Sequence, residues 1–127
     1  VLLEALPSET TRVVNTLAEA RKVIEAIGHP GISGMFDFHN CVDEESDWPT
    51  LIRTYADQIE HVHLNTWDGD YPRPEQSVEY AESFRALDEL GYDGWVSLEV
   101  FSEYPQPEEL LDGTRHCLDA VSVETAG

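Results

Sequence analysis

Four residues whose side chains can bind a metal ion lie at the ends of four short apolar segments of this chain. The segments are VLLEAL, GMFDFHN, HVHLNTW and WVSLEVF, and the residues are Glu4, Asp37, His63 and Glu99. They are separated by 33, 26 and 36 residues, each about one strand–helix unit. Three carboxylates and an imidazole are suitable ligands for a divalent cation. The spacing therefore predicts that successive parallel strands each bring one ligand to a common cation site.

The segments between these residues have the apolar periodicity of helices, so strands and helices alternate. We expect strands at 1–3, 34–39, 61–65 and 95–101. Helices are expected from Pro7 to Gly28, from Trp48 to Ile59, over 78–90 and from Pro107 to about Val121. Strict alternation predicts parallel strands joined by right-handed crossovers. The fold class is therefore α/β, built from four βα units of a TIM (β/α)8 barrel.

Side chains alternate across each predicted strand. In the second strand, Met35, Asp37 and His39 share one face, whereas Phe36 and Phe38 take the other. The other strands likewise have an apolar face and a face that becomes polar towards the carboxyl end. A buried acid is costly unless it is paired or bound to a metal. We therefore expect the apolar faces to pack on the helices and the polar faces to converge on a cation.

The chain has 127 residues, which is about half of the roughly 250 that a complete barrel needs. It begins at Val1 rather than at Met, directly in a segment that reads as a buried strand. We therefore expect residues 1–127 to be a fragment, the C-terminal half of a barrel. Half a barrel leaves open sheet edges, so we expect it to pair with a missing N-terminal half or with a second copy.

The composition excludes several classes of partner. Acidic residues number 26 against 7 basic ones, which gives a net charge of −19. This charge repels phosphate backbones and anionic lipids, so no nucleic-acid partner is expected. No membrane partner is expected either, because no apolar run approaches a membrane span. Cys41 and Cys117 form no CxxC motif, which indicates free thiols in a reducing compartment and a cytoplasmic location.

Other polar residues have simpler interpretations. His61 lies deeper in its strand and reads as a packed core residue. The acidic run at 43–45 reads as a solvated loop. Asp68 and Asp70 flank Gly69 and are expected only to shape a turn.

The chain resembles the C-terminal half of the xylose isomerase-like barrel superfamily, which contains sugar phosphate isomerases and epimerases. The segments MFDFHN, HVHLN and LGYDGWVSLEVF carry the resemblance, and the last is the most specific. The resemblance implies that the chain supplies strands five to eight of a TIM barrel. It also implies one bound cation, Mn²⁺ first, with Mg²⁺, Co²⁺ or Zn²⁺ as alternatives. Its ligands would be Glu4, Asp37, His63 and Glu99.

The resemblance also implies a substrate site. His39 matches a substrate-contacting histidine of the family, although it follows Asp37 by two residues instead of the usual three. The family's arginine six residues after the strand-seven histidine is replaced here by Gly69, and the nearest arginine is Arg73. The expected substrate-binding residues are His39, Asn65, Trp67, Arg73 and Phe101. Trp67 and Phe101 are expected to form an apolar wall that limits water.

The implied activity is a metal-dependent isomerase or epimerase acting on a ketose or related polyol. The cation would stabilise an enediolate, while Glu4 and Glu99 act as the acid–base pair. A keto-inositol dehydratase acting at the same site is an alternative, as is a non-catalytic sugar-binding barrel fragment. An endonuclease-IV-like phosphodiesterase ranks last, because its Asp-x-His pair is absent: Tyr71 and Pro72 follow Asp70.

Overall fold

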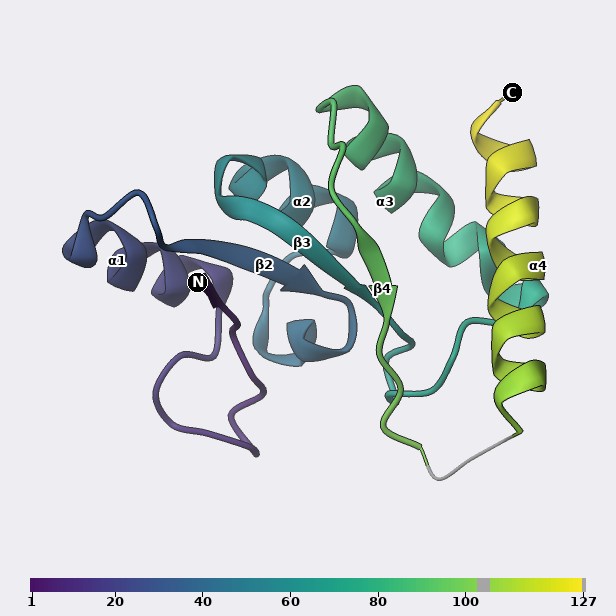
Figure 1. The fold of residues 1–127 in the computed structure, drawn as a ribbon, viewed down its shortest axis with the longest axis horizontal. Helices are drawn as coiled ribbons and strands as arrows, with labels where there is room; N and C mark the ends of the chain where they lie inside the picture. Colours follow the sequence, from purple (N-terminus) through teal and green to yellow (C-terminus); the bar gives the residue numbers. More distant parts are fainter. Residues whose placement is uncertain (103–105, 127) are drawn as a thin grey trace.

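The computed structural model describes residues 1–102 and 106–126. Its four strands form one parallel sheet in the order β1-β2-β3-β4, which is also their order along the chain. The strands are β1 (Leu2–Leu3), β2 (Ser33–Asp37), β3 (Ile59–Leu64) and β4 (Val96–Leu98). Each strand is followed by a helix (Figure 1). The predicted α/β class and the four βα units are confirmed as part of a (β/α) barrel.

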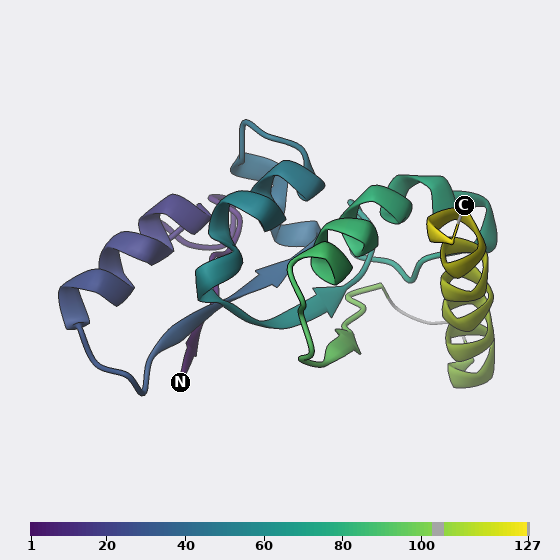
Figure 2. The ribbon, with the colours of Figure 1, turned by 90° about the horizontal axis from the view of Figure 1, so that it is seen from above.

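The described residues form four α-helices: α1 (Leu17–Ile27), α2 (Trp48–Tyr55), α3 (Ser77–Glu89) and α4 (Pro107–Thr125). The same residues form three short 3₁₀ helices: η1 (His39–Asp43), η2 (Ala56–Gln58) and η3 (Pro74–Gln76). Helices α1, α2 and α3 lie over one face of the sheet, and α4 packs beside α3 (Figure 2). Within the described residues, no helix is both long and apolar enough to span a lipid bilayer.

The core lies between the sheet and these helices, as the alternation predicted. Phe36 and Phe38 are completely buried and meet edge to face at 5.1 Å between ring centroids. Phe38 also packs edge to face against Trp48 at 4.8 Å and Tyr80 at 5.4 Å. Such contacts add to the stabilisation that burial of aromatic area provides.

Both cysteines are buried and unpaired, as predicted. Burial raises the pKa of Cys41 well above its ordinary value and that of Cys117 to about 11. Neither thiol is therefore a reactive thiolate at neutral pH.

The start of the first helix was predicted wrongly. Helix α1 begins at Leu17, after a loop, and not at Pro7. Thr16 has extended backbone, and its side chain accepts a hydrogen bond from the Glu19 N–H. This Thr-x-x-Glu pattern is a helix-start signal. Val13 lies within the range that was predicted as helix, and it is 81% exposed.

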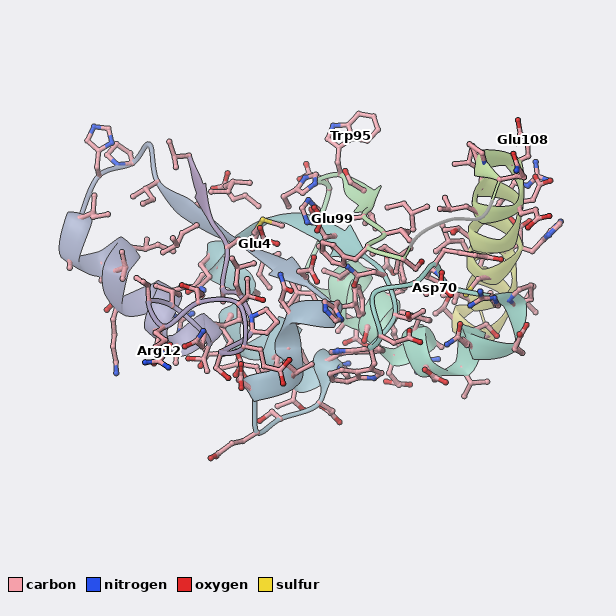
Figure 3. All side chains as sticks on the ribbon, turned by 90° about the horizontal axis from the view of Figure 1, so that it is seen from below. Glu4, Arg12, Asp70, Trp95, Glu99 and Glu108 are labelled. Carbon is pink, nitrogen blue, oxygen red and sulfur yellow. The ribbon has the colours of Figure 1, made fainter. Side chains whose placement is uncertain are left out.

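Two other boundaries differ from expectation, and so does the burial of the first strand. Ile59 opens β3 instead of closing α2. β4 covers only Val96–Leu98, so Trp95 lies before it and is 81% exposed. Trp95 projects away from the sheet (Figure 3). The first strand is also less buried than expected, because Leu2 is 40% exposed.

The acidic run after β2 is not a simple solvated loop. Asp43 accepts hydrogen bonds from the backbone N–H and the hydroxyl of Ser8, at 2.6 and 2.8 Å. Glu44 accepts the Leu17 N–H at 2.6 Å, at the start of α1. These acids therefore hold the loop between β1 and α1, where helix-terminal N–H groups favour negative charge.

Candidate metal centre

Four ligand atoms converge at the carboxyl ends of the strands. Among the described residues, Glu4, Asp37, His63 and Glu99 each offer one ligand atom, and these atoms all lie within 4.8 Å of one another. Figure 3 shows Glu4 and Glu99 close together at this end of the sheet. The four residues picked out by their spacing are thus brought together by the fold.

The strand register explains this convergence. Asp37, the last residue of β2, lies directly opposite His63 of β3, and His63 lies opposite Ser97 of β4. Glu99 is two residues beyond Ser97, and residues two apart on a strand share a face. Its backbone N–H still donates to the Leu64 carbonyl at 3.1 Å, which keeps Glu99 beside β3 although β4 ends at Leu98.

The imidazole of His63 faces the three carboxylates. Its Nδ1 atom lies 3.0 Å from Glu99 Oε2, 3.3 Å from Asp37 Oδ2 and 3.6 Å from Glu4 Oε1. This nitrogen is buried, yet it makes no hydrogen bond of suitable geometry. An unsatisfied buried nitrogen beside three carboxylate oxygens is a donor set that a divalent cation would satisfy. The residues present therefore fit such a cation.

The electrostatics of the cluster also favour a cation. Burial raises the pKa of Glu4, and the negative charges of Asp37 and Glu99 raise it further, against the opposing effect of His63. Like charges at short range disfavour ionisation of a carboxylate. A bound cation would offset this repulsion.

Two buried asparagines hold the ligands. Asn65 Nδ2 lies 3.2 and 3.3 Å from the two carboxylate oxygens of Asp37. Asn40 donates its backbone N–H to Asp37 Oδ1 and its side-chain Nδ2 to Glu4 Oε1, each at 3.0 Å. Asn65, which was expected to contact substrate, has no exposed surface. Asn40 was not among the predicted site residues, and the local signal was Asp37 itself, because an aspartate side chain often accepts a backbone N–H a few residues on.

His39 does not continue β2, contrary to expectation. The chain turns at Phe38, whose φ and ψ are −62° and −43°, and His39 begins the 3₁₀ helix η1. Its Nδ1 hydrogen-bonds to the Trp67 carbonyl at 2.7 Å, and its ring lies 5.4 Å from that of Phe101. Because a carbonyl only accepts, Nδ1 carries the proton, and Nε2 of the neutral ring is an acceptor.

A cavity of about 310 Å³ lies beside Asn40, the residue that donates hydrogen bonds to Asp37 and Glu4. Its lining residues are Leu6, Pro7, Thr10, His39, Asn40 and Phe101. Two of the expected substrate residues, His39 and Phe101, thus border it. The volume is at the lower end of the range for small-molecule sites.

Trp67 and Arg73 lie outside this cavity lining. Trp67 is 46% exposed, and its ring stacks on that of Trp48 at 4.4 Å between centroids. The Arg73 guanidinium pairs with Asp70 at 2.8 Å and lies over the Tyr71 ring.

The loop after β3 is tied to the segment after β4. The Phe101 N–H donates to the Gly69 carbonyl at 2.8 Å, and the Ser102 hydroxyl donates to Asp70 Oδ1 at 3.0 Å. Asp70 therefore does more than shape a turn, because it joins Arg73 to Ser102. Gly69 has a φ of +77°, and a Cβ placed there would lie 3.0 Å from the Phe101 ring.

His61 is not one of the clustered ligands, and it is half-buried instead of being the core residue expected. Its ring is perpendicular to that of His63, with 5.2 Å between centroids. It therefore packs against a ligand and does not replace one.

Comparison with known proteins agrees with this geometry. Residues 1–120 match the family described as xylose isomerase-like TIM barrel. Over 102 residues the chain is 32% identical to a ketose 3-epimerase from Arthrobacter globiformis, which covers 80% of this chain and 35% of that protein. It is 26% identical to a probable ketose 3-epimerase from Synechocystis, with 80% and 34% covered.

Solved structures show the same fold. An L-ribulose 3-epimerase superposes with a TM-score of 0.82 at 22% identity, covering 98% of this chain and 48% of that one. For the 3-keto-D-glucoside 4-epimerase of E. coli the TM-score is 0.79 at 24% identity, with 97% and 45% covered. The chain thus spans about a third of these curated relatives and about half of these solved structures. The match over residues 1–120 places the chain in the xylose isomerase-like TIM barrel family.

Proposed function

We propose that this chain is the C-terminal half-barrel of a ketose epimerase and supplies its cation-binding active site. The observation that carries the proposal is the convergence of Glu4, Asp37, His63 and Glu99 around the unsatisfied Nδ1 of His63. The names of the relatives support a ketose as substrate, since two of them are ketose 3-epimerases or probable ones. A divalent cation, Mn²⁺ in the first instance, would supply a Lewis acid that stabilises negative charge developing on a substrate oxygen.

The proposed acid–base pair is Glu4 and Glu99. They follow the two outer strands of the sheet, β1 and β4, so they reach the cluster from opposite sides. An epimerase must take a proton from one face of a carbon and return a proton to the other face. One carboxylate would start ionised and accept the proton from carbon. The electron pair of the broken C–H bond would move into the adjacent carbonyl group to form an enediolate. The other would enter protonated and deliver its proton to the opposite face.

The walls of the site come from two loops. His39 and Phe101 border the cavity next to the cluster, so they are the residues proposed to contact the sugar directly. His39 would accept a hydrogen bond from a sugar hydroxyl through Nε2, because its Nδ1 is engaged with the Trp67 carbonyl. Trp67 and Arg73 are proposed to contact parts of the sugar outside this cavity. For Asn65, burial favours holding Asp37 over contact with substrate.

The test is turnover of a panel of ketoses by the purified protein with Mn²⁺, followed by separation of the epimers. Exchange of the carbon-bound proton in deuterated water reports the proton transfer itself. Glu99→Gln is expected to abolish both ketose turnover and proton exchange, because the amide cannot accept the proton. Glu60→Gln is the matched control, because Glu60 is exposed on β3.

Near-normal turnover by Glu99→Gln would contradict the acid–base assignment. Loss of water from the substrate, in place of a new epimer, would identify a dehydratase using the same residues. Stoichiometric Mn²⁺ binding without proton exchange on any ketose would instead indicate a sugar-binding barrel.

A further inference from the structure

We infer that Asn40 and Asn65 are positioning residues that hold Glu4 and Asp37 in the orientation in which these carboxylates bind a cation. The inference rests on the proposed function, because it assigns a role towards the cation of that same site. Both residues hydrogen-bond to the proposed cation ligands, and Asn40 also borders the substrate cavity.

Asn65 is oriented by contacts at both ends of its side chain. Its Oδ1 accepts the His39 backbone N–H at 2.7 Å, so the other end must be the Nδ2 donor. That donor faces both oxygens of Asp37 at 3.2 and 3.3 Å. In addition, the Tyr80 hydroxyl donates to the backbone carbonyl of Asn65 at 2.8 Å, so the backbone of this residue is held from the core side. Asn65 therefore presents a fixed donor to a buried carboxylate.

Asn40 links two ligands from different strands. Its backbone N–H binds Asp37 Oδ1, while its side chain extends to Glu4 Oε1, each at 3.0 Å. The second contact spans 36 residues of sequence and is the one that an ordinary local turn would not need. It fixes the Glu4 carboxylate, which comes from a loop just beyond the end of a two-residue strand.

Neutral amides suit this task for a chemical reason. A lysine or arginine in these positions would bring a positive charge that competes with the cation, whereas an added carboxylate would increase the repulsion in the cluster. An amide N–H donates without either effect. Each carboxylate oxygen has two lone pairs, so it can accept an amide hydrogen bond and still bind a cation. Partners of this kind orient metal ligands in many metal sites.

Burial favours an indirect action. Asn65 has no exposed surface, and Asn40 is 6% exposed. Their effect on the site would pass mainly through Glu4 and Asp37.

The experiment measures Mn²⁺ affinity of the purified protein, using the electron paramagnetic resonance signal of free Mn²⁺ and no sugar. The variants are Asn40→Ala, which keeps the backbone N–H on Asp37, and Asn65→Ala. Each is expected to bind Mn²⁺ about 10- to 100-fold more weakly than the wild type. The visible spectrum of bound Co²⁺ is expected to change as well, because it reports ligand geometry and not global stability.

The matched control is Gln58→Met. Gln58 is also a buried amide, and it bonds the Leu17 carbonyl and Arg21 away from the cluster. This variant is expected to lose stability but to keep the wild-type Mn²⁺ affinity and Co²⁺ spectrum. An equal loss of affinity in Gln58→Met would overturn the inference, because the effect would then follow general destabilisation.

The remaining outcomes separate the inference from the proposed function. If the folded wild type binds no Mn²⁺, the metal centre itself is wrong and the positioning role falls with it. If the wild type binds Mn²⁺ and folded Asn40→Ala binds it equally well with an unchanged Co²⁺ spectrum, the metal centre stands and the inference is overturned. Asn40→Ala decides the question alone if Asn65→Ala does not fold, because it removes a contact at the end of the sheet and not within the core.

Discussion

The two faces of the sheet bury neighbouring residues by opposite means. Phe36 and Asp37 are adjacent in β2, and they are 0% and 4% exposed. On the helix side, burial of Phe36 is itself stabilising, because apolar area leaves water and packs against other rings. On the other side, burial of Asp37 is unfavourable and must be offset by amide donors and, as proposed, by a cation. One face therefore sets the stability of the fold, and the other is arranged for charge.

The largest expected effect on this contrast comes from the apolar face. Phe36→Ala should lower the free energy of unfolding by about 3–5 kcal/mol, because it leaves a cavity in a packed core. Urea unfolding measures this loss. Where the variant remains folded, its Mn²⁺ affinity should match that of the wild type. A loss in the free energy of unfolding below about 1 kcal/mol would show that the core closes over the gap.

The neighbouring residue should behave in the opposite way. Asp37→Asn should weaken Mn²⁺ binding by about 100-fold or more, because a charged ligand is lost from the cluster. Its free energy of unfolding without metal should change less than in Phe36→Ala, since a buried charge is removed and the volume is kept. Isothermal titration calorimetry and urea unfolding measure the two quantities, and equal stability losses in both variants would remove the distinction between the faces.

A smaller effect is expected where the two loops above the site meet. Gly69→Ala places a side chain at a φ of +77° and 3.0 Å from the Phe101 ring. We expect a stability loss of about 1–3 kcal/mol from the backbone and weaker sugar binding from the displaced ring.

Gly91→Ala is the matched control for Gly69→Ala. Its φ is +68°, and nothing lies within 4 Å of the added Cβ. Gly91→Ala should lose a similar amount of stability from its backbone conformation and leave sugar binding unchanged. If both variants bind sugar equally, Phe101 is not a wall of the site.

The smallest expected effect is a dependence on pH without metal. The pKa of Glu4 is raised in the fold, chiefly by burial, from its ordinary value of 4.5. The folded state thus holds this proton to a higher pH than the unfolded chain, so the contribution to stability is complete below pH 4.5 and is lost as pH rises through the raised pKa. Thermal unfolding against pH tests this.

Glu4→Gln is the control for the pH dependence. Glutamine cannot titrate, so this variant should lose the part of the slope of stability against pH that Glu4 causes. Saturating Mn²⁺ should remove it too, because the cation favours the ionised carboxylate. A slope that persists unchanged in Glu4→Gln would assign the pH dependence to other groups.

Much of this architecture could be predicted from local patterns. Side-chain parity placed Phe36 with the core and Asp37 with the site, and the spacing identified all four clustered ligands. The start of helix α2 at Trp48 was predicted correctly, and Asp47 caps it by accepting the Thr50 N–H at 3.0 Å. The missed start of α1 was also local, because Thr16 and Glu19 form a recognisable cap.

The rest depended on contacts between distant residues. The pairing of β2 with β3 shifts register between Gly34 and Phe36, and only this irregularity sets Asp37 opposite His63. Nothing near Asn65 in the sequence indicates that its amide will bind Asp37, 28 residues away. The same holds for the bond from the Ser102 hydroxyl to Asp70, 32 residues apart.

The sequence by itself thus determined which residues face the helices and which face the site, because strand periodicity is a property of the local backbone. It also determined the chemical character of the site, through the types of the strand-end residues. Only the tertiary structure decided how those residues meet. It set which carboxylate oxygen faces His63 Nδ1, which amide holds each carboxylate, and which loops border the cavity. These choices depend on register and on hydrogen bonds between separate strands, whose geometry exists only once the sheet has formed.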